Sequence, residues 1–159
     1  MADTKTFRSV LTGDFSVTAR PAPIPGDLRV GWGQSLLIMV LASALGQRCS
    51  IQKVHFLAHL SRTGDLRDRT REVLARKRDP IELAVRIEPW VNRAAAFAKA
   101  NGLVELREGK ALALSGQGKV AAEAIRKAGL LAEETAFLDE VGKVVTEKVV
   151  ESIMKMESF

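Results

Sequence analysis

Residues Ala98–Gly118 read AKANGLVELREGKALALSGQG, and this stretch predicts a helix end, a β-hairpin and the start of a second helix. Asn101 and Gly102 end the first helix, because glycine adopts the left-handed cap conformation without a Cβ clash. Gly109 lies in a charged turn between two short apolar strands and can supply the positive φ that a tight hairpin needs. Ser115 is placed to cap the helix that follows.

A two-stranded ribbon directly after a helix is the layout of a winged helix. We therefore expect a mainly α (α+β) fold, with a small β-hairpin as the wing. The 159 residues suit one domain with an added arm or tail. We expect three parts, which are an extended N-terminal arm over 1–29, a winged-helix domain over 30–129 and a C-terminal interaction helix over 130–159.

Apolar periodicity and breaker residues predict the helices of the central part. The expected helices are Gln34–Leu45, Ile51–Ser61, Asp65–Lys77, Pro89–Ala100 and Gly116–Ala128. In the fourth of these, Trp90, Ala94, Phe97 and Ala98 are expected to point inward. Ile81–Ile87 alternates apolar and polar residues and predicts a third strand beside the hairpin, although IELA could equally be a turn of helix.

The N-terminal arm is rich in proline. Pro21, Pro23 and Pro25 alternate with Ala22 and Ile24, a pattern that favours an extended polyproline-like path. Such an arm either crosses the protein's own core as a strap or docks on a partner. The arm residues that we assign to partner contact are Phe15, Val17 and Ile24.

From about Ala132 the chain predicts one long helix to the C-terminus. Its apolar residues recur at spacings of three and four and form a stripe wider than a lone surface helix needs. The stripe therefore either binds a partner or packs among the protein's own helices. The candidate partner contacts in it are Val141, Val145, Val149, Ile153 and Met154.

The net charge of +5 is concentrated in one segment. Arg62–Arg78 holds seven basic residues against three acidic ones, which favours either phosphate contact or a solvated helix face. The candidate phosphate contacts in this segment are Arg67, Arg71, Arg76, Lys77 and Arg78. Those in the helix before the hairpin and in the wing are Arg93, Lys99, Arg107 and Lys110.

No arrangement of residues points to catalysis. His55 and His59 lie four residues apart, as metal ligands can, but no third ligand, HExxH motif or paired CxxC accompanies them. SGQG at 115–118 lacks the GKS/T ending of a phosphate loop. Arg48 beside Cys49 is weak support for a reactive thiol. We therefore expect no enzyme activity, no metal site and no cofactor.

The sequence also predicts a soluble, cytoplasmic protein. Its single cysteine excludes an internal disulfide and fits a reducing compartment. The start MADTKTFRSV lacks the apolar stretch of a secretory signal. Leu36–Leu45 is the longest apolar run, and it is far shorter than the roughly 20 residues that cross a bilayer.

Two resemblances follow from these patterns. RAAAFAKANGLVELREGKALALSGQGKVAAEAI, over 93–125, resembles the second half of bacterial winged-helix proteins. IQKVHFLAHL and VRIEPWVNRAAAFAKANGLVE extend the likeness over 30–125, where the chain resembles the small middle components of three-component ABC-ATPase systems. These are Lamassu-like antiviral operons, in which an SMC-like coiled-coil ATPase works with an effector. The resemblance implies a non-catalytic accessory subunit that docks on the ATPase and helps couple the sensing of DNA or DNA ends to effector release.

The alternative function is that of a homodimeric DNA-binding transcriptional regulator. In that case the C-terminal helix forms the dimer, and the wing (Arg107 and Lys110) contacts DNA together with Arg93 and Lys99. The basic segment Arg62–Arg78 adds phosphate contacts. However, the helix Pro89–Ala100 presents mostly alanine outside its core positions, and base reading generally needs Arg, Asn, Gln or Lys in reach of the groove. The sequence therefore favours the accessory subunit, with contacts to the DNA backbone as an addition.

Overall fold

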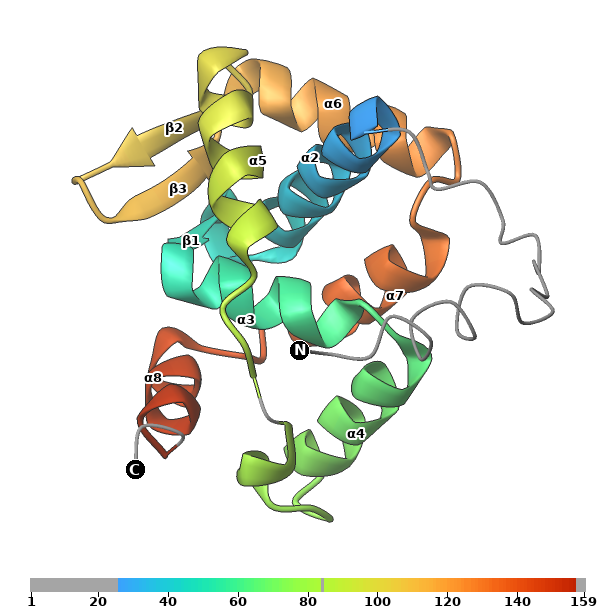
Figure 1. Cartoon of the computed structure of the whole chain (residues 1–159), viewed down its shortest axis with the longest axis vertical. Helices are drawn as coiled ribbons and strands as arrows, with labels where there is room; N and C mark the ends of the chain where they lie inside the picture. Colours follow the sequence, from blue (N-terminus) through green and yellow to red (C-terminus); the bar gives the residue numbers. More distant parts are fainter. Residues whose placement is uncertain (1–25, 84, 157–159) are drawn as a thin grey trace, which may run out of the picture.

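The computed structural model describes residues 26–83 and 85–156 of the chain (Figure 1). The helices in this part are α2 (Gly26–Ser43), α3 (Ile51–Ser61), α4 (Gly64–Leu74), α5 (Pro89–Ala100), α6 (Gly116–Lys127), α7 (Ala132–Val141) and α8 (Glu147–Met156). The strands are β1 (Arg48–Ser50), β2 (Val104–Arg107) and β3 (Ala111–Leu114), and two 3-10 turns are η1 (Leu45–Gln47) and η2 (Pro80–Leu83). The expected mainly α (α+β) class is confirmed.

Helix α2 is the centre of the core. Every residue from Leu36 to Leu41 is at most 3% exposed, and the helix contacts α3, α5, α6 and α7 (Figure 1). It begins at Gly26, eight residues earlier than the sequence indicated, so the arm ends no later than residue 25 rather than at 29. Phe15, Val17 and Ile24 lie outside the described residues.

The hairpin forms where it was expected. Glu108 and Gly109 both have positive φ, of 53° and 67°, as a two-residue turn of the mirror-image type requires. The hydroxyl of Ser115 accepts a hydrogen bond from the backbone N–H of Gly118 and donates one to the carbonyl of Gly102. The start of α6 is thereby fastened to the end of α5 across the hairpin.

The third strand is not the one that the sequence indicated. The sheet is antiparallel with the order β1-β3-β2, and Cys49 in β1 lies opposite Leu112 in β3. Of the two alternatives for Ile81–Ile87, the strand is wrong and the turn of helix over its first residues is confirmed, because η2 spans Pro80–Leu83. A strand of three residues such as β1 is too short to produce a periodic signal, and it runs directly into the cap of α3.

The expected single C-terminal helix is also wrong, because α7 and α8 are separated by residues 142–146. Gly142 packs so closely on α2 that a Cβ there would lie 2.6 Å from the Ser43 hydroxyl oxygen. Its carbonyl also accepts a hydrogen bond from the buried Lys53 ammonium at 3.0 Å. Because of the break, α7 packs on α2 and α8 packs on α3. Residues of both helices belong to the same hydrophobic core as α2 and α3. No helix within the described ranges is both long and apolar enough to cross a membrane.

Gly118 supplies a sharp test of the contact between α6 and the hairpin. A Cβ at this position would lie 2.0 Å from the carbonyl oxygen of Leu103, which is backbone and cannot rotate away. We predict that Gly118→Ala lowers the free energy of unfolding by about 1–3 kcal/mol through overpacking. Chemical denaturation monitored by circular dichroism measures this loss.

Gly116→Ala is the matched control, because nothing lies within 4 Å of a Cβ at Gly116 in the same helical turn. Alanine is the better helix former by roughly 1 kcal/mol, so this variant should be as stable as the wild type or more stable. Equal destabilisation by both alanines would contradict the close contact with Leu103.

Candidate functional site

A buried polar network fixes the start of α5. Glu88, which is 7% exposed, precedes α5 and accepts hydrogen bonds from three side chains. His59 Nδ1 donates to its Oε1 at 3.0 Å, Arg62 donates to the same oxygen at 2.7 Å, and Trp90 Nε1 donates to Oε2 at 3.2 Å. Because two of these donors belong to α3 or its end, the carboxylate ties α5 to α3 at one point.

His55 completes the same connection through the backbone. The N–H of Glu88 donates to His55 Nδ1 at 3.1 Å, so the other ring nitrogen carries the proton and donates to Asn92 Oδ1 at 3.2 Å. Both histidines therefore orient α5. Within the part of the chain that the structure describes, no group of three or more His, Cys, Asp or Glu residues is placed to hold a metal ion.

The electrostatics of this network favour a charged carboxylate. Burial alone would raise the pKa of Glu88, but the hydrogen bonds from His59 and Arg62 outweigh it and hold the pKa below its usual value. The Cys49 thiol behaves in the opposite way, since burial raises its pKa to about 12. Cys49 is therefore a neutral thiol at physiological pH and supplies no thiolate nucleophile.

An exposed aromatic surface lies where α2 meets α5. The rings of Trp32 and Trp90 are 5.2 Å apart between centroids, and a Cβ on Gly33 would lie 3.0 Å from the Trp90 ring. Trp32 is 38% exposed and Phe97 is 49% exposed. We define the α2–α5 aromatic surface as Trp32, Trp90 and Phe97, since Phe97 follows Trp90 by seven residues and therefore lies on the same side of α5.

The sequence-based prediction for one residue of this surface is wrong. Phe97 was expected to point inward, whereas the buried positions of α5 are Val91, Ala94 and Ala98. The inward stripe is rotated towards Val91, which leaves Phe97 at its solvent edge. No pattern in the sequence pointed to this surface, because Trp32 and Trp90 are far apart in the chain and meet only in the fold.

The cations of α5 and the hairpin remain on the surface. Arg93, Lys99, Arg107 and Lys110 are all exposed. Arg107 pairs with Glu105 at 2.9 Å on its own strand. Among the described residues, Arg93, Lys99 and Lys110 have no acidic partner within ion-pair distance. These three cations are therefore available to an external anion.

Most of the arginines around α4 form ion pairs with other residues of the protein. Arg67 is 8% exposed, donates to the carbonyl of Ser61 and pairs with Glu133. Arg71 pairs with Asp68 and Glu140 and lies 5.6 Å over the Phe137 ring, while Arg78 pairs with Glu72 and Glu82. Phosphate contact by Arg67, Arg71 and Arg78 is therefore not supported, since their guanidinium groups hold α4 to α7 and η2. Arg76 and Lys77 stay exposed, with no acidic partner in the described ranges.

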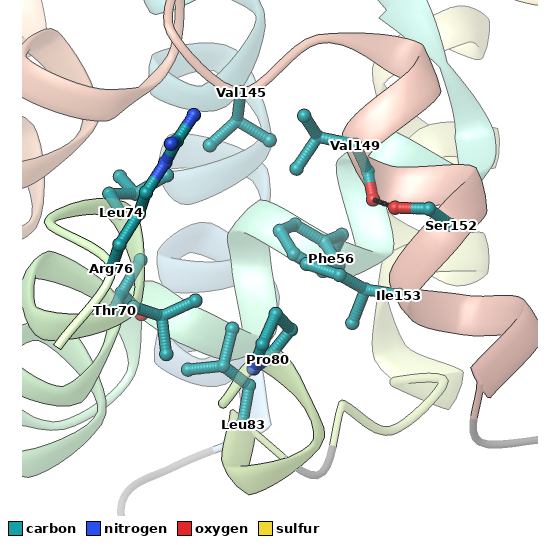
Figure 2. Close-up of a pocket in the computed structure, with 11 residues that line it drawn as sticks. Phe56, Thr70, Leu74, Arg76, Pro80, Leu83, Val145, Val149, Ser152 and Ile153 are labelled. Carbon is teal, nitrogen blue, oxygen red and sulfur yellow. Dashed lines mark hydrogen bonds between the residues drawn. The ribbon is translucent and has the colours of Figure 1, made fainter. Parts of the chain in front are cut away.

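The C-terminal apolar residues pack in or against the protein's own core. Val141, Val145 and Ile153 are buried in the core, and Val149 and Met154 are half-buried against it. Figure 2 shows Val145, Val149 and Ile153 facing Phe56 of α3 across an apolar pocket of about 190 Å³. The stripe that the sequence offered for partner contact thus packs mainly on α2 and α3, which required the break at 142–146.

Comparison of the chain with protein-family models, curated proteins and solved structures finds no match in any of the three.

Glu88 makes the stability that this network contributes depend on pH. A lowered folded-state pKa means that its contribution to stability is present above about pH 4.3, the ordinary glutamate pKa, and is lost as the pH falls through the lower folded-state value. We predict that Glu88→Gln lowers the free energy of unfolding at pH 7 by about 1–3 kcal/mol, and that the gap to wild type narrows in acid. Urea denaturation at several pH values measures both effects.

Glu82→Gln is the control for this experiment. Glu82 pairs with Arg78 on the surface, so its loss should change stability by no more than about 0.5 kcal/mol. A gap between wild type and Glu88→Gln that stays constant down to strongly acidic pH would contradict the assignment.

Proposed function

We propose that this protein is a non-catalytic winged-helix accessory subunit that binds a protein partner, an SMC-like coiled-coil ATPase. The element order supports the winged-helix interpretation, because helix α2, strand β1, helix α3, helix α5 and the β2–β3 hairpin follow one another with the sheet order β1-β3-β2. The chain departs from a minimal winged helix in one respect, since α4 and η2 are inserted between α3 and α5. The cytoplasmic location expected from the sequence is part of this proposal.

The observation that carries the proposal is the α2–α5 aromatic surface. In a DNA-reading winged helix, α5 would be the helix that enters the major groove and would present polar side chains to base edges. Here α5 exposes Phe97, while Trp90 and Trp32 continue the apolar surface onto α2. Tryptophan is enriched among the residues that dominate binding energy at protein interfaces. Such a surface suits an apolar helix face on the partner better than a phosphate backbone.

The nature of the partner rests on the likeness over residues 30–125 to middle components of three-component ABC-ATPase systems. A coiled-coil arm presents apolar and charged side chains along one helix face. The surface around Phe97 offers a complementary mixture, since Arg93 lies one helical turn before it on α5 and is exposed beside it. The proposed role is to dock on the ATPase in an antiviral defence complex.

We predict that Phe97→Glu abolishes co-purification with a co-expressed coiled-coil ATPase partner. Glutamate at this position replaces the phenyl ring with a charge in an apolar contact. Such substitutions commonly cost more than 2 kcal/mol of binding free energy, or about thirtyfold in affinity. Phe97 is half exposed, so the variant should fold normally. Affinity pull-down with quantitative mass spectrometry measures the loss.

Val120→Glu provides the matched control, because Val120 is an exposed valine on α6 outside the aromatic surface. It should co-purify with the partner like the wild type. Retention of the partner by Phe97→Glu, or loss in both variants, would remove the α2–α5 aromatic surface from the binding site.

The second candidate function is a homodimeric DNA-binding regulator. It is favoured by Arg93, Lys99 and Lys110, whose charges no acidic side chain neutralises within the described residues. Because most of the C-terminal stripe is packed in the core, the dimer contact of such a regulator would have to use another apolar surface. If the dimer used the α2–α5 aromatic surface, this candidate and the first would compete for the same residues.

Salt dependence distinguishes the two functions. For a DNA regulator, Arg93→Gln with Lys99→Gln should weaken duplex binding and lower the slope of log K against log salt by about 1.8, because two phosphate contacts are lost. The pair Lys127→Gln with Lys148→Gln removes the same charge from α6 and α8, away from the candidate phosphate contacts, and should leave the slope unchanged. Fluorescence anisotropy across a salt series measures both, and equal effects of the two pairs would contradict specific phosphate contacts by α5.

A further inference from the structure

A second surface, separate from the α2–α5 aromatic surface, gathers cations from four segments of the chain. A groove of about 590 Å³ lies between β1, the start of α3, the hairpin turn and the segment that joins α7 to α8. Arg48 comes from β1, Lys53 from α3, Lys110 from the hairpin turn and Lys143 from the connecting segment. These residues are far apart in sequence, and only the fold brings them together.

The charges in this groove are not balanced from within. Its lining holds four cations and a single acid, Glu147. The Glu147 carboxylate is already engaged, since Ser50 donates to it through its backbone N–H at 3.0 Å and through its hydroxyl at 2.6 Å. Lys143 also adds to the attraction that Arg126 exerts on Asp139, outside the groove. Arg48 and Lys110 have no acidic partner within ion-pair distance among the described residues.

The floor of the groove is rigid and the rim is open. Lys53 is 5% exposed and donates to the carbonyl of Gly142 at 3.0 Å, so its ammonium is fixed at the base. Arg48, Lys110 and Lys143 are exposed around it. Leu45, which is also exposed, adds an apolar wall on the side of η1.

These features match a small anion that carries an apolar body. Pockets that hold small molecules usually measure roughly 300–1,000 Å³, and this groove falls in that range. Arginine and lysine around a recess are the groups that bind phosphoryl oxygens through charge-assisted hydrogen bonds. A concave site of this size also fits a single nucleotide better than the continuous backbone of a duplex.

We propose that this groove binds a phosphorylated small molecule of nucleotide size, with its phosphates on Arg48, Lys110 and Lys143 and its ring system against Leu45. Ligand binding would join the hairpin turn to the segment between α7 and α8. It would therefore stabilise the folded state by mass action, by an amount that rises with the logarithm of the ligand concentration above the Kd.

Isothermal titration calorimetry of the full chain with ADP, inorganic pyrophosphate and adenosine tests this proposal. ADP and pyrophosphate should bind and adenosine should not, because the phosphates provide the attraction. Lys110→Gln with Lys143→Gln should weaken ADP binding about tenfold or more, as expected when two charge-assisted hydrogen bonds are lost. Lys110→Arg with Lys143→Arg should keep the binding, which shows that the loss comes from charge and not from misfolding.

The matched control is Lys127→Gln with Lys148→Gln, which removes the same charge from exposed lysines that do not line the groove. It should bind ADP like the wild type. Absence of ADP binding at millimolar concentration, or equal weakening by both glutamine pairs, would overturn the proposal. It would also be overturned if a short DNA duplex, and not ADP, lost its binding in the Lys110 and Lys143 pair, since the groove would then be a nucleic-acid contact.

Discussion

Burial of α2 on all sides is the constraint on which the rest of the structure depends. A helix without a polar face is stable in water only when other elements cover it completely. Fully burying one leucine-sized side chain contributes about 1.5–3 kcal/mol, and the run from Leu36 to Leu41 is entirely buried. Helices α3, α5, α6 and α7 each cover part of α2, and this shared requirement sets their positions around it.

The need to bury α2 also explains why the C-terminal residues form two helices and not one. Because the chain breaks between them, α7 packs on α2 and α8 packs on α3. The glycine at position 142 permits an approach to Ser43 that no other residue would. Apolar surface that would otherwise have been available to a partner is consumed by the protein's own core.

What remains on the surface is divided into two chemically different regions. The α2–α5 aromatic surface is apolar and supports contact with another protein, whereas the groove around Lys53 is strongly cationic and supports contact with phosphate. The network of Glu88, His55 and His59 bears on the first region, because its hydrogen bonds hold the start of α5 against α3. A change in that network would therefore move Trp90 relative to Trp32, and with it the geometry of the proposed docking surface.

Local signals in the sequence were sufficient for the hairpin, the caps and the helices α3, α5 and α6. Ser50, Gly109 and Ser115 act through neighbours within a few residues, so their effect can be deduced without knowing the fold. The apolar run in α2 likewise indicated a central helix. Other features depend on residues between about 60 and 100 positions apart. They are the third strand, the break at Gly142, the ion pairs of Arg67 and Arg71 with α7, and the approach of Lys110 and Lys143 to Lys53. Only the tertiary structure decided these features, because contacts of that range are set by how α2 is covered and leave no periodic pattern in the chain.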